Sequence, residues 1–396
     1  MSLSVPEVAL PAPDPQGLET SDQLTAQIRA ELDATGGAIS FARYMALALY
    51  APGLGYYRAG SPKFGARGDF TTAPECAPLF AHCLAQQCQQ VLAALDGGDI
   101  LEFGAGGGAL AVELLLELER LHCLPDRYFV MELSGELRQR QQALLRMRAP
   151  HLLARVVWLD NLVQAPFRGV VLANEMLDAM PVQCFTIAGD QIRERCVTWQ
   201  GSRFAWCDRP ADTLLSAAIA TVQADLPAPL PDGYCSEYNP ALPDWIASIA
   251  ALLTRGVALF IDYGYPRREY YLAERSSGTL LCHYRHRVHD DPLILTGLQD
   301  ITAHVDFTAV AKAAMATDLR VVGYTTQAHF LFGTGLLEMA AASDPEDLRA
   351  HLSLTDQIKT LSLPGAMGER FKVLALARDF AAPLRGFMFR DLRARL

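Results

Sequence analysis

The chain has 396 residues and a formal net charge of −10, with 51% hydrophobic and 20% charged residues. This balance predicts a globular protein with a large core rather than a disordered chain. The negative charge argues against a nucleic-acid partner, because neutralising phosphates takes clustered Lys and Arg. No apolar run reaches the length of a membrane span, and no signal or transit peptide is visible, so we expect a cytoplasmic protein.

Cysteine and histidine spacing does not indicate a metal centre. No two of the nine cysteines have C-x-x-C spacing, which predicts free thiols rather than a zinc cage or a disulfide framework. His283, His286 and His289 are spaced by three, and His304 follows. This spacing matches neither an i, i+4 helical pair nor a zinc finger, so we expect no metal site.

The N-terminal region is predicted to contain a tail, helices and a long loop. Residues 1–17 contain four prolines and predict a loose tail. Helices are expected over residues 21–35, 40–50 and 75–95. Between the last two lies a glycine-rich loop, residues 53–75, in which Thr71 and Thr72 precede the expected helix start. We interpret it as a lid whose two threonines contact a bound cofactor, and an ordinary connector is the alternative.

The strongest motif of the sequence is DILEFGAGGGAL, residues 99–110. Apolar residues lead into a glycine cluster and then into a leucine-rich segment, which predicts strand, tight turn and helix. Glycine lets backbone amides approach a ligand closely, and the start of a helix favours an anionic or polar group. We therefore expect Gly104, Ala105, Gly106 and Gly108 to bind a cofactor.

Two kinds of cofactor fit this turn, and Glu102 distinguishes them. Gly104, Gly106 and Ala109 also satisfy the G-x-G-x-x-G/A spacing of dinucleotide folds. However, a carboxylate at Glu102 would repel a pyrophosphate, whereas it suits the ammonium group of S-adenosylmethionine (SAM). Glu132, at the end of the second expected strand, can accept hydrogen bonds from both ribose hydroxyls. SAM is therefore favoured over a nicotinamide dinucleotide, and ordinary strand-end charges are the alternative.

Strands and helices continue to alternate, as in a doubly wound sheet. Leu133 follows Glu132 and is assigned to the cofactor site with it. The third expected strand ends at Asp160 and Asn161, whose oxygens could accept a hydrogen bond from the adenine amino group. Polar residues are also common in loops at strand ends. The assignment of Asp160 and Asn161 to the cofactor site therefore depends on the other predicted site residues.

Asn174, Glu175 and Asp178 follow the fourth expected strand, GVVLA. They lie at the carboxyl edge of the sheet, where open α/β folds bind ligands. If Glu175 begins a helical turn, Asp178 lies on the same face three residues later, and two carboxylates converge on one small site. The alternative is that both are acids favoured by the start of a helix.

The second half of the chain interrupts and then resumes this pattern. Turns at Gly189-Asp190 and Gly201-Ser202 predict hairpins, followed by a helix. Further strands are expected at 255–266, 319–327 and 371–379. We expect four parts: the N-terminal tail, helices and lid (1–95), the first part of the core (96–185), an inserted hairpin and helix lobe (186–235), and the second part of the core (236–396) with a loop insert at 264–303.

Seven expected strands, the E-x-G-x-G-x-G turn and the acid after strand two resemble a class I SAM-dependent methyltransferase. More narrowly, GDFTTAPE, LEFGAGGGALA, NEMLDAMPV, IDYGY and AHVDF are similar, in that order, to the MidA family. That family comprises bacterial proteins and the mitochondrial complex I assembly factor regarded as a protein-arginine methyltransferase. The resemblance implies an α/β, doubly wound, seven-stranded Rossmann-like sheet with a helical N-terminal region and an inserted lobe. It also implies SAM as methyl donor and S-adenosylhomocysteine as product.

The resemblance further implies a protein substrate methylated on arginine, with a respiratory-complex subunit as one candidate. Glu175 is the first choice to hold the guanidinium and Asp178 the second. Asn174 is expected to position the acceptor and to contact the cofactor, and His304 to reach the acceptor from the opposite wall. NEMLD lacks the second glutamate of the separate protein-arginine methyltransferases at matching spacing. Another nitrogen acceptor therefore stays open. An assembly chaperone that retains SAM without turnover and a homodimer are separate alternatives that also stay open.

Overall fold

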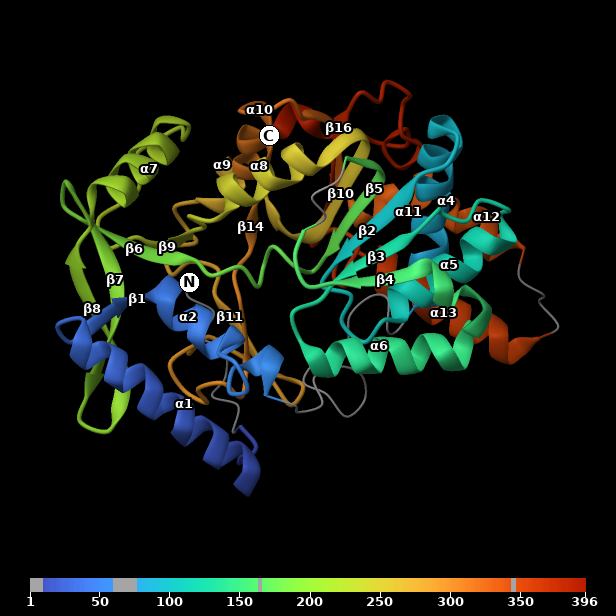
Figure 1. Ribbon diagram of the computed structural model, residues 1–396. Helices are drawn as coiled ribbons and strands as arrows, with labels where there is room; N and C mark the ends of the chain where they lie inside the picture. Colours follow the sequence, from blue (N-terminus) through green and yellow to red (C-terminus); the bar gives the residue numbers. More distant parts are fainter. Residues whose placement is uncertain (1–9, 60–76, 163–165, 343–346) are drawn as a thin grey trace. The chain divides into compact units, whose positions relative to one another are not determined.

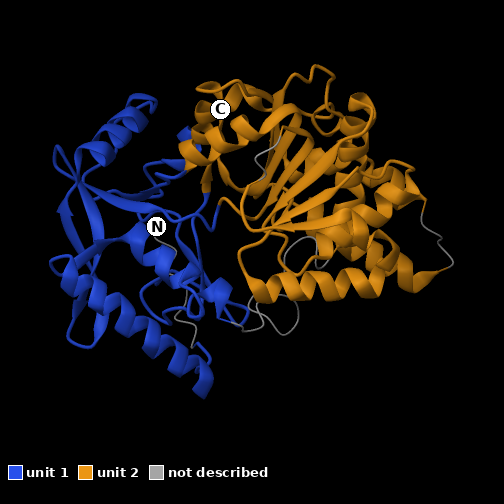
Figure 2. Cartoon of the chain, in the orientation of Figure 1, with its two compact units in different colours: residues 1–70, 178–241, 267–304 blue, residues 71–177, 242–266, 305–396 orange. Residues whose placement is uncertain are grey.

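A computed structural model describes residues 10–59, 77–162, 166–342 and 347–396. The chain forms two compact units (Figure 2). Unit 1 comprises Met1–Phe70, Asp178–Ala241 and Arg267–His304, and unit 2 comprises Thr71–Leu177, Leu242–Pro266 and Val305–Leu396. Each unit therefore collects three separate segments of the chain. The four-part division expected from the sequence stays a prediction.

Unit 2 is built around an eight-stranded sheet (Figure 1). Its strands are β2 (Asp99–Phe103), β3 (Tyr128–Met131), β4 (Val156–Leu159), β5 (Phe167–Asn174), β10 (Leu253–Tyr265), β14 (Val305–Asp306), β15 (Arg320–Thr326) and β16 (Phe371–Arg378). The order is β4-β3-β2-β5-β10-β16-β15, with β14 paired to β10. The strands from β4 to β10 pair in parallel, and β16 is antiparallel to both neighbours.

The seven strands from β4 to β15 confirm the predicted doubly wound sheet, and the short strand β14 is an eighth that was not predicted. The chain winds outward from β2 through β3 to β4 and then returns to place β5 on the other side of β2. Ligands of such sheets bind beyond the carboxyl ends of the strands at this change of direction. The glycine turn after β2 and the segment after β5 both lie there.

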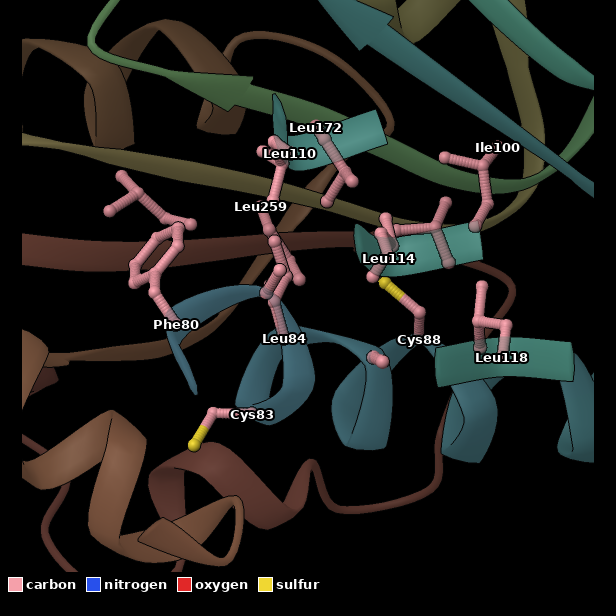
Figure 3. Packing of buried hydrophobic residues seen from close by; sticks show 14 of the residues in the cluster. Phe80, Cys83, Leu84, Cys88, Ile100, Leu110, Leu114, Leu118, Leu172 and Leu259 are labelled. Carbon is pink, nitrogen blue, oxygen red and sulfur yellow. The ribbon is translucent and has the colours of Figure 1, made fainter. Parts of the chain in front are cut away.

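Helices accompany the strands of unit 2. They are α4 (Pro78–Leu95), α5 (Ala109–Arg120), α6 (Gly135–Arg148), α8 (Leu242–Leu252), α10 (Phe307–Met315), α11 (Gln327–Gly333), α12 (Leu336–Ala341) and α13 (Leu348–Ser362), with short 3-10 turns η2 (Pro150–Arg155), η3 (Arg385–Phe387) and η4 (Arg393–Arg395). Apolar side chains at four-residue steps on α4 and α5 meet buried residues of the sheet in one core (Figure 3). Each such buried side chain contributes about 1.5–3 kcal/mol.

Helix α4 begins later than the sequence suggested. Its first residue is Pro78 and its N-cap is Ala77, which makes no side-chain capping hydrogen bond. Proline is favourable at this position, because the first amide of a helix has no partner within the helix. The expected start near residue 75 was therefore wrong, and Thr71 and Thr72, with most of the expected lid, lie outside the described residues.

Unit 1 contains a five-stranded antiparallel sheet, β1-β7-β6-β9 with β8 on β7, and a three-stranded sheet, β12-β11-β13. Its elements are α1 (Pro15–Ala34), β1 (Ala38–Ser40), α2 (Phe41–Tyr50), η1 (Tyr56–Arg58), β6 (Gln183–Ala188), β7 (Gln191–Gln200), β8 (Arg203–Pro210), α7 (Thr213–Ala224), β9 (Cys235–Tyr238), α9 (Arg267–Tyr270), β11 (Leu281–Tyr284), β12 (Arg287–His289) and β13 (Asp300–Thr302). The predicted hairpins are confirmed, with Gly189 and Gly201 in left-handed conformations at their turns.

Three details of unit 1 differ from the sequence prediction. The segment at 264–303, expected as a loop insert, contains helix α9 and the three-stranded sheet β12-β11-β13. Helix α1 begins at Pro15, where a loose tail was expected, because the Asp14 side chain caps it by accepting a hydrogen bond from the Gly17 N–H at 2.8 Å. Strand β9 lies in a segment for which the sequence predicted no strand. In addition, β1 pairs with β7, so the N-terminal segment and the hairpins share one sheet.

Candidate cofactor and acceptor site

The glycine turn after β2 requires its glycines. Gly104, Gly106 and Gly108 have φ values of +65°, +52° and +89°, the left-handed region that side chains disfavour. Gly108 is also the N-cap of α5, and a Cβ there would lie 3.0 Å from the Cα of Gln141. The predicted strand, turn and helix are therefore confirmed, and the first amides of α5 face the carboxyl edge of the sheet as donors.

Glu102 lies at the end of β2 and is 2% exposed. Its Oε2 accepts a hydrogen bond from the Tyr128 hydroxyl of β3 at 2.8 Å. Burial raises the pKa of Glu102 to about 7; the Tyr128 hydrogen bond opposes this rise, and the charge of Glu132 adds to it. A cation placed against this carboxyl would stabilise its charged form. The sequence analysis missed Tyr128, which is the first residue of β3 and pairs with Ile100 of β2.

Glu132 lies just after β3 and is almost fully buried. Its Oε1 accepts from the Ser134 N–H at 2.8 Å, and its Oε2 accepts from Nε2 of Gln141 at 3.1 Å. Burial raises the pKa of Glu132, while these two hydrogen bonds lower it. The carboxylate is thus held in one orientation at the strand end. The next side chain, Leu133, is 56% exposed and offers an apolar surface there.

Asp160 and Asn161 are exposed after β4. Oδ1 of Asp160 lies 2.8 Å from Nη2 of Arg138, on helix α6. The same guanidinium nitrogen donates to the carbonyls of Glu132 at 3.2 Å and Leu159 at 2.8 Å. Arg138 therefore ties the ends of β3 and β4 together, a role that sequence analysis missed. The expected contact of Asp160 and Asn161 with adenine stays a prediction.

The segment after β5 is not helical, so the expectation that Glu175 begins a helical turn was wrong. Glu175 has φ +50°, and its N–H donates to the Ile261 carbonyl at 2.9 Å. The next two amides, of Met176 and Leu177, donate to Oδ2 of Asp262 at 3.2 and 2.9 Å. These bonds fix the three amides on β10, and the positive φ of Glu175 excludes a right-handed helical turn that begins there.

The bonds to β10 leave Asn174 and Glu175 adjacent at the strand end. Nδ2 of Asn174 donates to Oε1 of Glu175 at 3.2 Å. This contact presents an amide and a carboxylate together beyond the carboxyl end of β5. Asp262, which anchors the following residues, is 1% exposed and was another residue that sequence analysis missed.

Asp178 and His304, the other two predicted acceptor residues, belong to unit 1. The carbonyl of Asp178 accepts a hydrogen bond from the Ala303 N–H at 2.9 Å, which brings the two segments together. The His304 N–H donates to Oγ1 of Thr279 at 3.0 Å. Convergence of these residues with Asn174 and Glu175 stays a prediction.

Within the described ranges, no group of three or more His, Cys, Asp and Glu side chains is arranged to hold a metal ion. His283 and His289 lie on the neighbouring strands β11 and β12, and burial lowers the pKa of both. Over the same ranges, no helix is both long enough and apolar enough to cross a bilayer.

Comparison with known proteins decides the family. A family model described as "Putative S-adenosyl-L-methionine-dependent methyltransferase" matches residues 83–325, which include the glycine turn and the segment after β5. The chain belongs to this methyltransferase family. The resemblance to SAM-dependent methyltransferases is thereby confirmed, and so is the choice of SAM over a dinucleotide.

Relatives of this methyltransferase include proteins named "Protein arginine methyltransferase NDUFAF7, mitochondrial". The one from Danio rerio is 29% identical over 376 residues, covering 86% of this chain and 83% of the relative. The one from Homo sapiens is 25% identical over 381 residues, covering 86% and 80%. Similarity at this level extends across both units.

Solved structures give a closer match to this methyltransferase. A crystal structure of a COG1565 superfamily member from Burkholderia thailandensis, bound to S-adenosyl-homocysteine, has a TM-score of 0.93 and 43% identity. It covers 98% of this chain and 100% of that chain. A native crystal structure of a COG1565 superfamily protein from the same organism has a TM-score of 0.89 and 42% identity, with the same coverage.

Proposed function

We propose that this methyltransferase transfers the methyl group of SAM to an arginine side chain of a protein substrate. The observation that carries the proposal is the fixed pair Asn174 and Glu175, held beyond β5 by the bonds of the following residues to β10. The relatives named protein arginine methyltransferases, which match most of the chain, support the choice of acceptor.

The residues at the carboxyl edge of unit 2 fit the cofactor. Three left-handed glycines permit close approach of the backbone, and the buried carboxyl of Glu102 suits an ammonium group. Glu132 presents a carboxylate in a fixed orientation for the ribose hydroxyls. SAM supplies an electrophilic methyl group on a sulfonium. The chain's own residues bind and orient it.

Glu175 and Asn174 would act on the acceptor. A guanidinium is a planar cation, so a carboxylate binds it by charge-assisted hydrogen bonds and fixes the nitrogen that reacts. In the transfer, the S–CH3 bond breaks and an N–CH3 bond forms on that nitrogen. One proton leaves the same nitrogen, so the products are S-adenosylhomocysteine and a methylarginine that keeps its positive charge.

The test uses labelled SAM and protein extract from cells that lack this protein. The purified wild-type chain should label a protein band, and mass spectrometry should locate the label on arginine. Glu175→Gln should lower methyl transfer at least 100-fold, because the neutral amide no longer pairs with the guanidinium. It should leave S-adenosylhomocysteine affinity within about twofold, as should the control Glu119→Gln, which changes an exposed carboxylate on α5.

Three results would contradict the proposal. Label on lysine or on a small molecule would overturn the acceptor class. Full transfer by Glu175→Gln would remove Glu175 from the site. Full biological activity of a variant that transfers no methyl group would favour the chaperone that retains SAM without turnover.

A further inference from the structure

The Gln141 side chain, on helix α6, joins three elements of unit 2 and is 3% exposed. Its Nε2 donates to the carbonyl of Gly106 in the glycine turn at 2.9 Å and to Oε2 of Glu132 at 3.1 Å. Its Oε1 accepts a hydrogen bond from Nε1 of Trp158, on β4, at 2.9 Å. One amide therefore connects the turn after β2 with the ends of β3 and β4.

These partners define the orientation of the amide. A glutamine side chain has two N–H donors on one atom and an acceptor on the other. Gly106 and Glu132 offer only acceptors, whereas the Trp158 indole offers only a donor. Rotating the amide by 180° would place oxygen against two oxygens and the NH2 group against the indole N–H, which breaks all three bonds. The network therefore admits a single arrangement.

The two acceptors of Gln141 lie in the parts of the site assigned to different ends of SAM. Gly106 belongs to the turn expected at the methionine end, and Glu132 is the expected ribose acceptor. Gly108 also packs tightly on the Gln141 backbone, because a Cβ there would approach its Cα to 3.0 Å. Gln141 thus sets the position of the glycine turn relative to the Glu132 carboxylate.

We propose that Gln141 is a positioning residue for SAM, which holds the Gly106 carbonyl and the Glu132 carboxylate in the geometry that binds the cofactor. The inference rests on the proposed function, since it uses the proposed cofactor contacts of the glycine turn and Glu132. It differs from a purely structural role, in which Gln141 would only fill space beneath β3 and β4.

A purely structural residue would not change the protonation of the site, so pH provides the test. The charged groups that act on Glu132 are Arg138 of α6 and Glu102 of β2. The Gln141 hydrogen bond lowers the pKa of Glu132, against the effect of burial. Without that hydrogen bond the pKa rises further, so Glu132 loses its charge at a higher pH and binds the ribose hydroxyls less well.

The experiment measures S-adenosylhomocysteine affinity by isothermal titration calorimetry between pH 6 and pH 8. Gln141→Leu should bind roughly tenfold more weakly at pH 8, the factor expected for one lost hydrogen bond to a charged group, and weaker still at pH 6. Gln141→Glu should show the opposite trend. A protonated Glu at position 141 can still donate to Glu132 at low pH, but two carboxylates repel at high pH.

The matched control is Gln142→Leu, one position along the same helix, where the side chain accepts only an exposed hydrogen bond from Arg146 at 3.3 Å. It should bind like wild type at every pH. Affinities are compared as ratios to the wild-type value at the same pH, which removes any effect of pH on the ligand itself. Melting temperatures of the three variants report any loss of folding separately.

Opposite pH trends in the two Gln141 variants would support the inference. Equal, pH-independent affinities in wild type, Gln141→Leu and Gln141→Glu would overturn it and leave the proposed function intact. A uniform loss that tracks the melting temperature would also overturn it, in favour of a structural role. If the wild-type chain itself did not bind S-adenosylhomocysteine, the proposed function would fall with it.

Discussion

Each unit buries a carboxylate at the end of a strand. The two carboxylates differ in how far along the chain their hydrogen-bond donors lie. Glu132 of unit 2 receives its hydrogen bonds from Ser134 and Gln141, two and nine positions away. Glu237 of unit 1, on β9, receives them from Tyr270 and Thr279, 33 and 42 positions away. Burial raises the pKa of both carboxyls.

This difference shows how each region is specified. The Glu132 site forms within successive strand and helix units, whose turn and capping residues are close in sequence. The Glu237 site requires closing a long loop before any of its bonds can form. Its partner Thr279 also accepts a hydrogen bond from the His304 N–H, so one predicted acceptor residue depends on this distant assembly. We therefore expect substitutions outside recognisable local motifs to lower the stability of unit 1 more than that of unit 2.

The largest expected effect is at Gly278, which precedes Thr279. Gly278 has φ +81°, and a Cβ there would lie 2.0 Å from Oε1 of Glu237. Gly278→Ala should lower the free energy of unfolding by about 4 kcal/mol, because a strained backbone adds to the loss of buried hydrogen bonds. Chemical denaturation measures the loss, and hydrogen exchange should locate it in unit 1.

The control for this prediction is Gly233→Ala. Gly233 has a similar φ of +77°, but its Cβ would meet nothing within 4 Å. Gly233→Ala should lower the free energy of unfolding by only about 1–2 kcal/mol, because backbone strain alone contributes. Equal losses in the two variants would show that the Glu237 network adds nothing to the backbone strain at Gly278.

The next effect concerns pH and Glu102. Its pKa rises from an ordinary 4.5 to about 7 in the folded chain, so the folded state binds more protons than the unfolded state between these values. The free energy of unfolding should therefore fall as pH rises from about 4.5 to 7, by about 3 kcal/mol from this group. Glu102→Gln should flatten this fall in denaturation curves measured across the range. If the free energy of unfolding of Glu102→Gln changed with pH as in wild type, Glu102 would not be the carboxyl that titrates over this range.

Cofactor binding sharpens the same prediction. If the ammonium group of S-adenosylhomocysteine pairs with Glu102, binding lowers the pKa of that carboxyl. At pH 7 the wild-type chain should then release a fraction of a proton on binding, whereas Glu102→Gln should release none from this site. Calorimetry in buffers of different ionisation enthalpy measures the release. Equal proton release by the two proteins would place the ammonium elsewhere.

The smallest effect is expected at Arg138, which joins the ends of β3 and β4. Arg138→Gln removes the donors to the carbonyls of Glu132 and Leu159 and should cost about 1 kcal/mol, with a two- to threefold loss of S-adenosylhomocysteine affinity. Asp160→Asn breaks only the ion pair of Arg138 with an exposed carboxylate and should cost less than about 0.5 kcal/mol. Calorimetry and denaturation separate the two variants; a larger effect from Asp160→Asn would indicate direct contact with the cofactor.

Local motifs explain which predictions succeeded. The glycine turn, the hairpin turns and the helix after Ser40 depend on the backbone preferences of a few adjacent residues, and each is confirmed. The start of α1 was misplaced because proline was interpreted as a sign of a loose tail, although Pro15 fits the first helical position after the cap Asp14. The sequence did contain the local signal for the helix start, and the error was in its interpretation.

The helical turn at Glu175 failed for a different reason. Its amide and the next two bond to Ile261 and Asp262, some 86 positions along the chain, so no nearby residue could reveal this arrangement. The Gln141 network belongs to the same class. Gln141 is one of several polar residues on α6, and only the packing of β4 against that helix shows that Trp158 holds its amide.

The sequence by itself determined the order of the seven main strands of unit 2, the glycine turn and the acid at the end of β3, because turn, cap and apolar-spacing preferences act over a few residues. Tertiary structure alone decided which distant side chains donate to the buried Glu237 carboxylate, how the segment after β5 is held, and that β1 pairs with β7. These features depend on contacts between residues far apart in the chain, whose partners are chosen by packing and hydrogen-bond satisfaction in the folded state.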